Sequence, residues 1–238
     1  MKKLILGALV GDVAGSKYEF HNIKTKNFRP VDKDCYPTDD SIMTIAVWDM
    51  WLNNCLDDKE KIIDTFKKWG KKYPNAGYGG HFFSWVLGDD RLPYNSFGNG
   101  AAMRISPIGW IANSEEEVKR LSYNVTSVTH DHPEGIKGAE VTAMCIYYAR
   151  IGKSKEFIRD YIFEQYPETA NLDYNDLVIN FYHDEETCQA TLPQALYCFL
   201  ISNSFEDCLK TTISIGGDCD TTSAVSCAIA EAYYKRFH

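Results

Sequence analysis

Apolar residues recur at helical spacing along most of the chain, and polar or glycine-rich stretches separate the apolar segments. Apolar positions at i, i+3, i+4 and i+7 are typical of a helix with one face against a core. The pattern predicts helices over 2–15, 39–54, 58–72, 80–87, 101–112, 114–128, 133–151, 154–165, 187–202, 205–213 and 220–236. Residues 16–37 and 166–186 are predicted to be loops, because prolines interrupt the first and the second is polar.

Two helix starts carry clear capping signals. Thr38 is a good N-cap for the apolar helix that follows, with Asp39 and Asp40 in its first turn. Ser114 and Glu117 have the spacing of a capping box. The sequence shows no alternating strand pattern, no repeat of solenoid length and no linker. We therefore expect a single all-α domain over residues 1–238.

Composition and charge narrow the class of protein. Hydrophobic residues make up 45% of the 238 residues, which argues against disorder. The net charge of −8 argues against binding to long nucleic acid or an anionic membrane surface. No apolar run approaches the ~20 residues of a membrane span, and no signal peptide is evident, so we expect a cytoplasmic protein. None of the eight cysteines forms a Cys-x-x-Cys pair, which favours buried thiols over structural zinc.

Two acidic clusters share a local design. Asp39-Asp40 and Asp218-Cys219-Asp220 each begin a helix beside a hydroxyl residue, and Gly216-Gly217 precedes the second cluster. Helix capping would explain one carboxylate in each cluster. The alternative is that the clusters converge, together with Asp12 and Glu19, into an all-oxygen pocket. Such a pocket selects Mg²⁺ or Mn²⁺ over zinc.

Two further stretches carry candidate chemistry. Ser96 to Arg104 is a glycine-rich turn that leads into a helix, and it could hold a phosphate or be a plain turn. His130 and His132 could bind zinc, but no cysteine lies near them, so a polar contact role is favoured over zinc.

Five motifs, taken in order, resemble the ADP-ribosylglycohydrolase family, which includes dinitrogenase-reductase-activating glycohydrolases and ADP-ribosyl-arginine and ADP-ribosyl-serine hydrolases. The motifs are residues 7–15 (GALVGDVAG), 38–41 (TDDS), 98–104 (GNGAAMR), 129–130 (TH) and 217–221 (GDCDT). They span nearly the whole chain and keep the family's order.

The resemblance implies a compact orthogonal helical bundle around a centre of two Mg²⁺ or Mn²⁺ ions. By position, the implied metal ligands are Thr38, Asp39, Asp40, Asp218, Asp220 and Thr221. Glu19 resembles the family's mobile acidic residue near the metals. The implied substrate-binding residues, which would contact ADP-ribose, are Gly98, Asn99, Gly100, Ala101, Met103 and His130.

The implied reaction is hydrolysis of the glycosidic bond between ADP-ribose and an acceptor, with metals that hold ribose hydroxyls and position a water. Glu19, Asp39 and Asp40 are all candidates for the general acid or base. The expected acceptor is a protein arginine side chain. A serine, a nucleobase, a small molecule, and a non-catalytic ADP-ribose-binding or immunity-type protein of the same fold stay open.

The sequence also departs from the family pattern. Cys219 stands where the family usually has Thr, Ser41 replaces a usual Thr, and Glu231 stands where the last helix often has Gly. The chain is short for the family, so loops that select the leaving group are expected to be trimmed. The expected partner is an ADP-ribosylated protein or ADP-ribose, and a monomer is expected.

Overall fold

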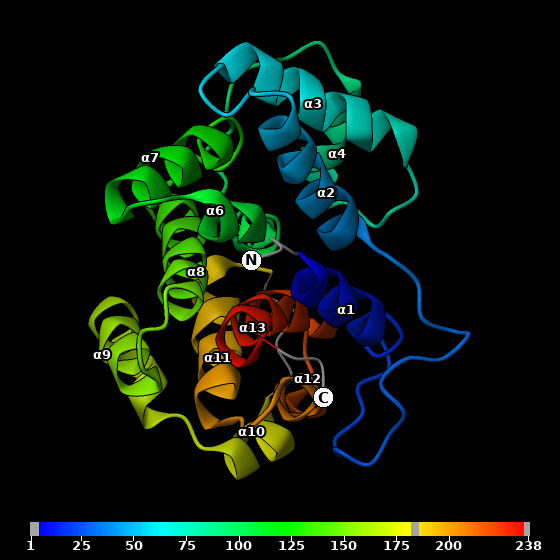
Figure 1. The fold of residues 1–238 in the computed structure, drawn as a ribbon. Helices are drawn as coiled ribbons and strands as arrows, with labels where there is room; N and C mark the ends of the chain where they lie inside the picture. The colour runs from blue at the N-terminus through cyan, green and yellow to red at the C-terminus, as the bar shows by residue number, and fades with distance from the viewer. Residues whose placement is uncertain (1–4, 182–185, 236–238) are drawn as a thin grey trace.

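The computed structural model describes residues 5–181 and 186–235, and these residues form helices joined by turns and loops (Figure 1). The helices are α1 (Leu6–Gly15), α2 (Asp39–Leu52), α3 (Lys59–Lys72), α4 (Gly80–Leu87), α5 (Gly100–Met103), α6 (Ser106–Ile111), α7 (Glu115–Thr126), α8 (Pro133–Arg150), α9 (Lys155–Gln165), the 3-10 helix η1 (Pro167–Asn171), α10 (Tyr174–Asn180), α11 (Cys188–Ile201), α12 (Phe205–Ile215) and α13 (Cys219–Tyr234). Within the described ranges the fold is all-α, as the sequence predicts.

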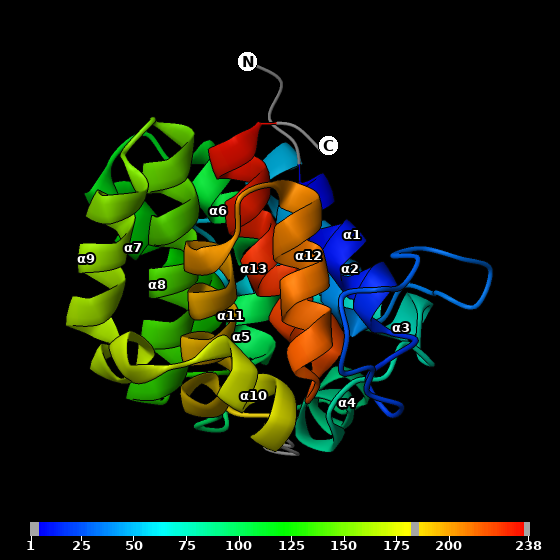
Figure 2. The ribbon, with the colours of Figure 1, turned by 90° about the horizontal axis from the view of Figure 1, so that it is seen from below.

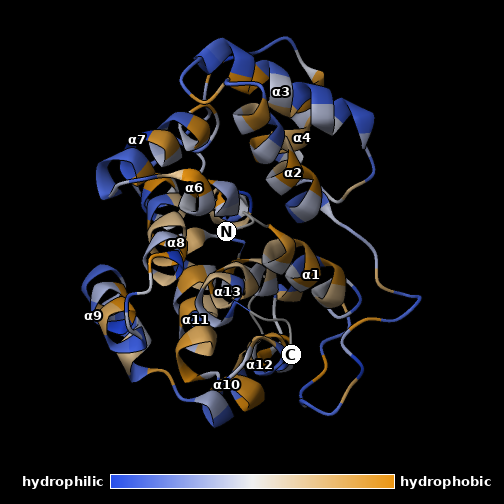
Figure 3. Cartoon of the chain, viewed as in Figure 1, coloured by the Kyte–Doolittle hydropathy of each residue, from blue (hydrophilic) through white to orange (hydrophobic). Residues whose placement is uncertain are grey.

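Helix α13 lies at the centre of the bundle, with α1, α8, α11 and α12 packed around it (Figures 1 and 2). All of its residues from Cys219 to Ala232 are buried. The outer helices α3, α7 and α9 instead show mixed faces, with polar residues turned outward (Figure 3). Such amphipathic helices bury one stripe against the core.

Helix α1 packs on α13 through a stripe of small residues. Gly7, Gly11 and Gly15 recur every four residues on one face of α1. A Cβ atom on Gly11 would overlap the backbone of Ser223, and one on Gly15 would lie 2.5 Å from the Cα atom of Asp220. The glycines therefore allow α1 to approach the first turns of α13 closely, which brings Asp12 beside the second acidic cluster.

Two predicted boundaries are wrong. The helix expected over 101–112 is two helices, because the chain turns at Arg104 and Ile105 and Pro107 begins the first turn of α6. The loop expected over 166–186 contains η1 and α10, and Asp173 caps α10 by accepting the N–H of Asp176. The part of this loop at 182–185 lies outside the described residues.

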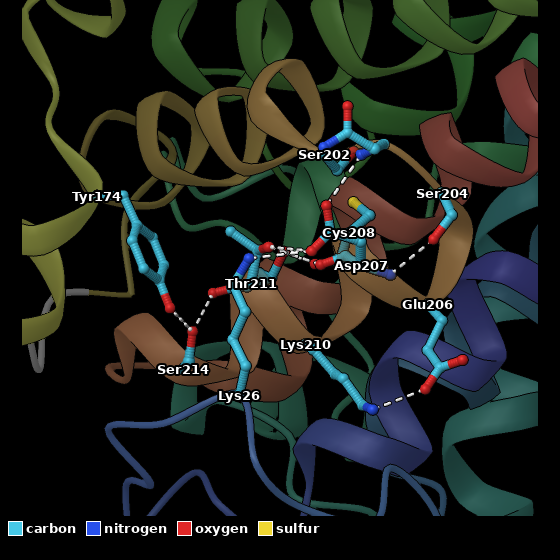
Figure 4. Close-up of polar contacts among 12 residues, drawn as sticks. Lys26, Tyr174, Ser202, Ser204, Glu206, Asp207, Cys208, Lys210, Thr211 and Ser214 are labelled. Atoms are coloured by element: carbon cyan, nitrogen blue, oxygen red, sulfur yellow. Dashed lines mark hydrogen bonds and ion pairs between the residues drawn. The ribbon is translucent and has the colours of Figure 1, made fainter.

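The loop between α1 and α2 is fastened onto α12 (Figure 4). Lys26 Nζ lies 3.0 Å from Asp207 Oδ1 and 4.9 Å from the ring centroid of Tyr174. Tyr174 in turn shares a 2.8 Å hydrogen bond with Ser214 near the end of α12. These contacts hold the loop, α10 and α12 together just before the Gly216-Gly217 turn.

The eight cysteines are free thiols, and all but Cys35 are buried, as the sequence predicts. Among residues 5–181 and 186–235, no helix combines the length and apolarity that a bilayer crossing requires.

Candidate metal and substrate site

A cavity of about 340 Å³ opens between the N-terminal ends of α2, α5 and α13. Its walls come from seven separate stretches of the chain. Among its lining residues are Glu19, Asp39, Asp40, Gly98, Asn99, Gly100, Met103, Arg104, His130, Glu186, Asp218, Asp220 and Thr221. The structure thus brings together most of the residues that the sequence predicts to bind metal or substrate.

The Gly216-Gly217 turn aims the second acidic cluster into this cavity. Both glycines have positive φ, +80° and +71°, a conformation that L side chains rarely adopt. Asp218 occupies the N-cap position of α13, but its side chain makes no capping hydrogen bond. It accepts instead from Asn99 Nδ2 at 2.6 Å, across the cavity wall. Capping therefore does not explain Asp218.

Asp40 is the buried member of the first cluster. Its Oδ2 accepts from Thr221 Oγ1 at 3.2 Å and lies 3.3 Å from Thr38 Oγ1, whose proton is directed to Asp12. Its Oδ1 is buried and has no hydrogen-bond partner within the described part of the chain. An unpartnered buried carboxylate oxygen is costly unless a cation or proton satisfies it.

Asp12 organises the start of α2. The N–H groups and the hydroxyls of Thr38 and Ser41 all donate to its two carboxylate oxygens. One oxygen each of Asp12, Asp40 and Asp220 lie within 4.8 Å of one another. Because protein donors already surround Asp12, it holds the ligand-bearing turn in place more than it offers a free oxygen.

Glu19, Asp218 and Asp220 form a second cluster, again with one oxygen each within 4.8 Å. Asp220 belongs to both clusters and therefore connects them. Two adjoining groups of carboxylates at helix starts can hold two divalent cations with oxygen ligands. The donor set, all carboxylate and hydroxyl oxygen, fits Mg²⁺ or Mn²⁺.

The acids of the cavity repel one another in the absence of cations. Burial, followed by the charge of Asp218, raises the pKa of Glu19 to about 7. Burial, followed by the charge of Asp12, raises the pKa of Asp39 to about 8. Burial, followed by the charge of Asp12, raises the pKa of Asp40 well above its ordinary value. Burial, followed by the charge of Asp218, likewise raises the pKa of Asp220 well above its ordinary value. Bound cations would reverse this balance and favour the carboxylates.

The cavity lining also includes one buried positive charge, Arg104. Arg104 is 1% exposed, and its guanidinium lies 4.4 Å from the ring centroid of Phe66. Burial lowers the pKa of Arg104 only to about 10, so it stays charged at neutral pH. Its side chain has no ion-pair partner among the described residues. The cavity lining therefore combines several carboxylates with one buried guanidinium.

Arg104 also determines which ring nitrogen of His130 carries the proton. The Arg104 Nη2 donates to Thr129 Oγ1 at 2.7 Å and lies 3.4 Å from His130 Nδ1. The distance between Thr129 Oγ1 and His130 Nδ1 is 2.8 Å. Burial and the Arg104 charge hold the pKa of His130 well below its ordinary value, so the ring is neutral. Since a guanidinium only donates, Nδ1 is the acceptor, and the proton is assigned to Nε2 beside the Gly98–Gly100 turn.

Some predicted residues lie outside the cavity wall. Thr38 is buried behind Asp40, and Ala101 is fully buried with its N–H bonded to the Gly98 carbonyl. His132 caps α8 through the N–H of Glu134 and packs on Phe97. His130 and His132 therefore have separate roles, a polar contact for each, as the sequence favours.

Cys219 now has a structural account. Its buried thiol lies beneath the turn, 3.3 Å from the Gly217 carbonyl and 3.7 Å from the Tyr18 carbonyl. The thiol supports the backbone between Asp218 and Asp220 and is directed away from the cavity wall. Arg104 and Glu186 are charged wall residues that were absent from the predicted site, whereas the sequence placed Asp12 in the acidic pocket without its supporting role. The sequence did signal Asp12 and Arg104 through their glycine-rich motifs, whereas nothing local marked Glu186.

Comparisons with known proteins agree with this geometry. The ADP-ribosylglycohydrolase family matches over residues 1–236. Human ADP-ribosylhydrolase ARH3 is 25% identical, with 97% of this chain and 84% of the human protein aligned. The ADP-ribosyl-[dinitrogen reductase] glycohydrolase of Rhodospirillum rubrum is 26% identical, with 96% of this chain and 83% of that protein aligned.

The fold agrees as well. A solved structure described as an ADP-ribosylglycohydrolase-related protein complex superposes with a TM-score of 0.72 at 24% identity, covering 97% of this chain and 85% of that chain. The fold and its acidic cavity define an all-α protein of the glycohydrolase type. The chain belongs to the ADP-ribosylglycohydrolase family. Membership supports hydrolysis of an ADP-ribosyl linkage as its activity.

Proposed function

We propose that this protein is a metal-dependent hydrolase that cleaves the bond between ADP-ribose and a protein arginine side chain, and so reverses mono-ADP-ribosylation. The observation that carries the proposal is the mixed lining of one cavity. Several carboxylates line it together with a buried guanidinium and a neutral histidine. A ligand with ribose hydroxyls next to an anionic diphosphate matches both kinds of lining group.

Two Mg²⁺ or Mn²⁺ ions would be held between the starts of α2 and α13. The proposed ligands on the cavity wall are Asp39, Asp40, Asp218, Asp220 and Thr221, and Thr38 would join them from behind Asp40. When bound, the ions supply Lewis-acid polarisation at the ribose hydroxyls and the attacking water. The unpartnered Oδ1 of Asp40 supports this assignment, because it offers a lone pair that no described protein donor occupies.

Proton transfer is assigned to the acids at the cavity edge. Glu19, Asp39 and Asp40 are the candidates, and Glu19 is favoured because it lies on the cavity wall and is not one of the proposed metal ligands. A carboxyl group at that place can give a proton to a leaving group or take one from water. The nearby carboxylates also stabilise positive charge that develops on the ribose ring.

The part of the lining around His130 would bind the diphosphate and the distal part of ADP-ribose. Gly98 and Gly100 leave room for close approach, because a Cβ on Gly100 would lie 3.4 Å from His130 Nε2. The N–H on Nε2 would donate to an oxygen of the ligand, and Arg104 contributes its charge from behind. Met103 adds an apolar contact, while Asn99 orients Asp218 from this side.

The acceptor is proposed to be arginine on electrostatic grounds. Glu19 and Glu186 lie on the cavity wall with Asp218, so the acceptor side is acidic. A guanidinium leaving group gains from this field, whereas a serine hydroxyl does not. The R. rubrum relative, whose name describes an ADP-ribosyl-protein glycohydrolase, is consistent with a protein substrate.

The second candidate is a non-catalytic ADP-ribose-binding protein of the same fold, or a hydrolase of another acceptor. The complete set of acids favours activity over binding alone. Incubating the protein with matched ADP-ribosyl-arginine and ADP-ribosyl-serine peptides in excess Mg²⁺ tests the acceptor. Faster ADP-ribose release from arginine is expected, and faster release from serine would contradict it. A cytoplasmic monomer that contacts neither membrane nor long nucleic acid remains part of the proposal.

A further inference from the structure

The side-chain amide of Asn22 hydrogen-bonds to both the N–H and the carbonyl of Gly217. Its Oδ1 accepts the Gly217 N–H at 2.7 Å, and its Nδ2 donates to the Gly217 carbonyl at 3.1 Å. The side chain thus occupies the place that a neighbouring backbone strand would take. It fixes the turn that comes directly before Asp218.

The same amide nitrogen also holds the loop that carries Glu19. Asn22 Nδ2 lies 2.8 Å from the Tyr18 carbonyl and 3.0 Å from the Glu19 carbonyl. One side chain therefore contacts two segments that are 195 positions apart in sequence. Glu19 belongs to one of these segments, while Asp218 and Asp220 follow the other.

The turn and the side chain fit one another closely. A Cβ on Gly216 would lie 2.7 Å from Asn22 Oδ1, so only glycine leaves room for this pairing. Two residues further along, Lys24 Nζ donates to the Ile215 carbonyl at 2.5 Å. Lys26 follows with its ion pair to Asp207 (Figure 4). Alternate side chains from Asn22 to Lys26 thus fasten the loop along α12 and the turn, with Asn22 closest to the acids.

We propose that Asn22 is a positioning residue of the acidic site, a clamp that fixes Glu19 relative to Asp218 and Asp220. The three carboxylates have one oxygen each within 4.8 Å of one another, and the two segments that carry them share the Asn22 amide. The clamp itself rests on these contacts alone. Its effect on turnover, through Glu19, rests on the proposed function.

The clamp is tested first by hydrogen exchange. Gly217 N–H donates to Asn22 Oδ1, so Asn22→Ala should speed exchange of that amide about tenfold or more. Asn22→Asp keeps an acceptor oxygen but loses the donors, so it should protect the Gly217 amide and loosen residues 18–21. Asn27→Ala is the matched control, since Asn27 is exposed on the same loop. Unchanged Gly217 exchange in Asn22→Ala would overturn the clamp.

The second test separates positioning from general stability. With excess Mg²⁺ and an ADP-ribosyl-arginine peptide, Asn22→Ala should lower kcat about tenfold or more and leave KM within about threefold. In a Glu19→Gln background the same substitution should change kcat less than about twofold, because the positioned group is already lost. Equal losses in both backgrounds would overturn positioning through Glu19. If the wild-type protein releases no ADP-ribose, the proposed function fails, and the exchange result alone decides the clamp.

Discussion

Thr221 Oγ1 donates a hydrogen bond to Asp40 Oδ2 at 3.2 Å, across 181 positions of sequence. This contact joins the start of α13 to the start of α2. Both residues lie at helix N-termini, where the helix dipole favours negative charge. The dipoles offset part of the repulsion among the carboxylates. Raised pKa values show that protonation relieves the rest in the absence of metal, and the proposed cations would do so when bound.

Replacing Asp40 by Asn should remove metal binding and preserve the fold. The change deletes a buried ligand charge, so Mn²⁺ affinity measured by calorimetry should fall about 100-fold or more. Without metal, the variant should melt at or above the wild-type temperature, because one crowded acid is gone. Asp89→Asn, on the exposed surface, is the matched control. Wild-type Mn²⁺ affinity in Asp40→Asn would show that the acid is not a ligand.

Mg²⁺ should stabilise the native state strongly. Free ion at about 100 times its Kd adds about 2.7 kcal/mol to the free energy of unfolding. For a chain of this length that raises Tm by about 5–10 °C. Thermal melts with Mg²⁺ or with a chelator measure the shift. A melting temperature that does not respond to Mg²⁺ or Mn²⁺ would count against the two-cluster site.

Arg104→Met should weaken ADP-ribose binding and change the state of His130. The substitution keeps an apolar side chain beside Phe66 and removes both the charge and the donor to Thr129. Affinity should fall about tenfold or more. In nitrogen NMR spectra the wild-type His130 should carry its proton on Nε2 near neutral pH. In the variant the pKa of His130 should rise, because the Arg104 charge is gone, but it should stay below its ordinary value because the ring remains buried. A wild-type His130 that titrates normally would refute the assignment.

Glu231 should make the protein less stable as pH rises. Its Oε2 accepts the Gly7 N–H at 2.7 Å, but Oε1 is buried without a partner within the described residues. Burial raises the pKa of Glu231 from 4.5 to about 7. Between those values the native state binds more protons than the unfolded state, so stability falls as pH rises through this window.

The loss from Glu231 amounts to about 3 kcal/mol at most. Glu231→Gln should therefore flatten the fall in Tm between pH 5 and pH 8, measured in excess Mg²⁺ so that the cavity acids stay ionised. Glu164→Gln on the surface is the control. If both variants follow the wild-type curve, Glu231 does not titrate in this window.

The helices of this chain follow from local pattern, because capping residues and apolar periodicity mark their ends. The sequence missed α10 because the helix is only seven residues long and only Leu177 of it is buried. It merged α5 and α6 because the residues from Ala101 to Ala112 are almost all apolar, which conceals the turn at Arg104.

The residues of the acidic site that belong to recognisable sequence motifs were predictable, and the other residues of the site were not. Asp39, Asp40, Asp218 and Asp220 stand out as paired acids beside hydroxyls and glycines. Glu186 and Asn22 have no such local signal, because their importance comes from contacts made by folding. The role of Asp12 as an acceptor for Thr38 and Ser41 likewise depends on how α1 packs against the start of α2.

The central claim is that the two acidic clusters hold cations that make this protein an ADP-ribosyl hydrolase. The most direct measurement is ADP-ribose release from an ADP-ribosyl-arginine peptide, with Mg²⁺, with chelator, and with Asp218→Ala in Mg²⁺. The account predicts release by the wild-type protein in Mg²⁺, and loss of at least about 100-fold with chelator or with Asp218→Ala. Undiminished release in the presence of chelator, or no release by the wild-type protein in Mg²⁺, would contradict it.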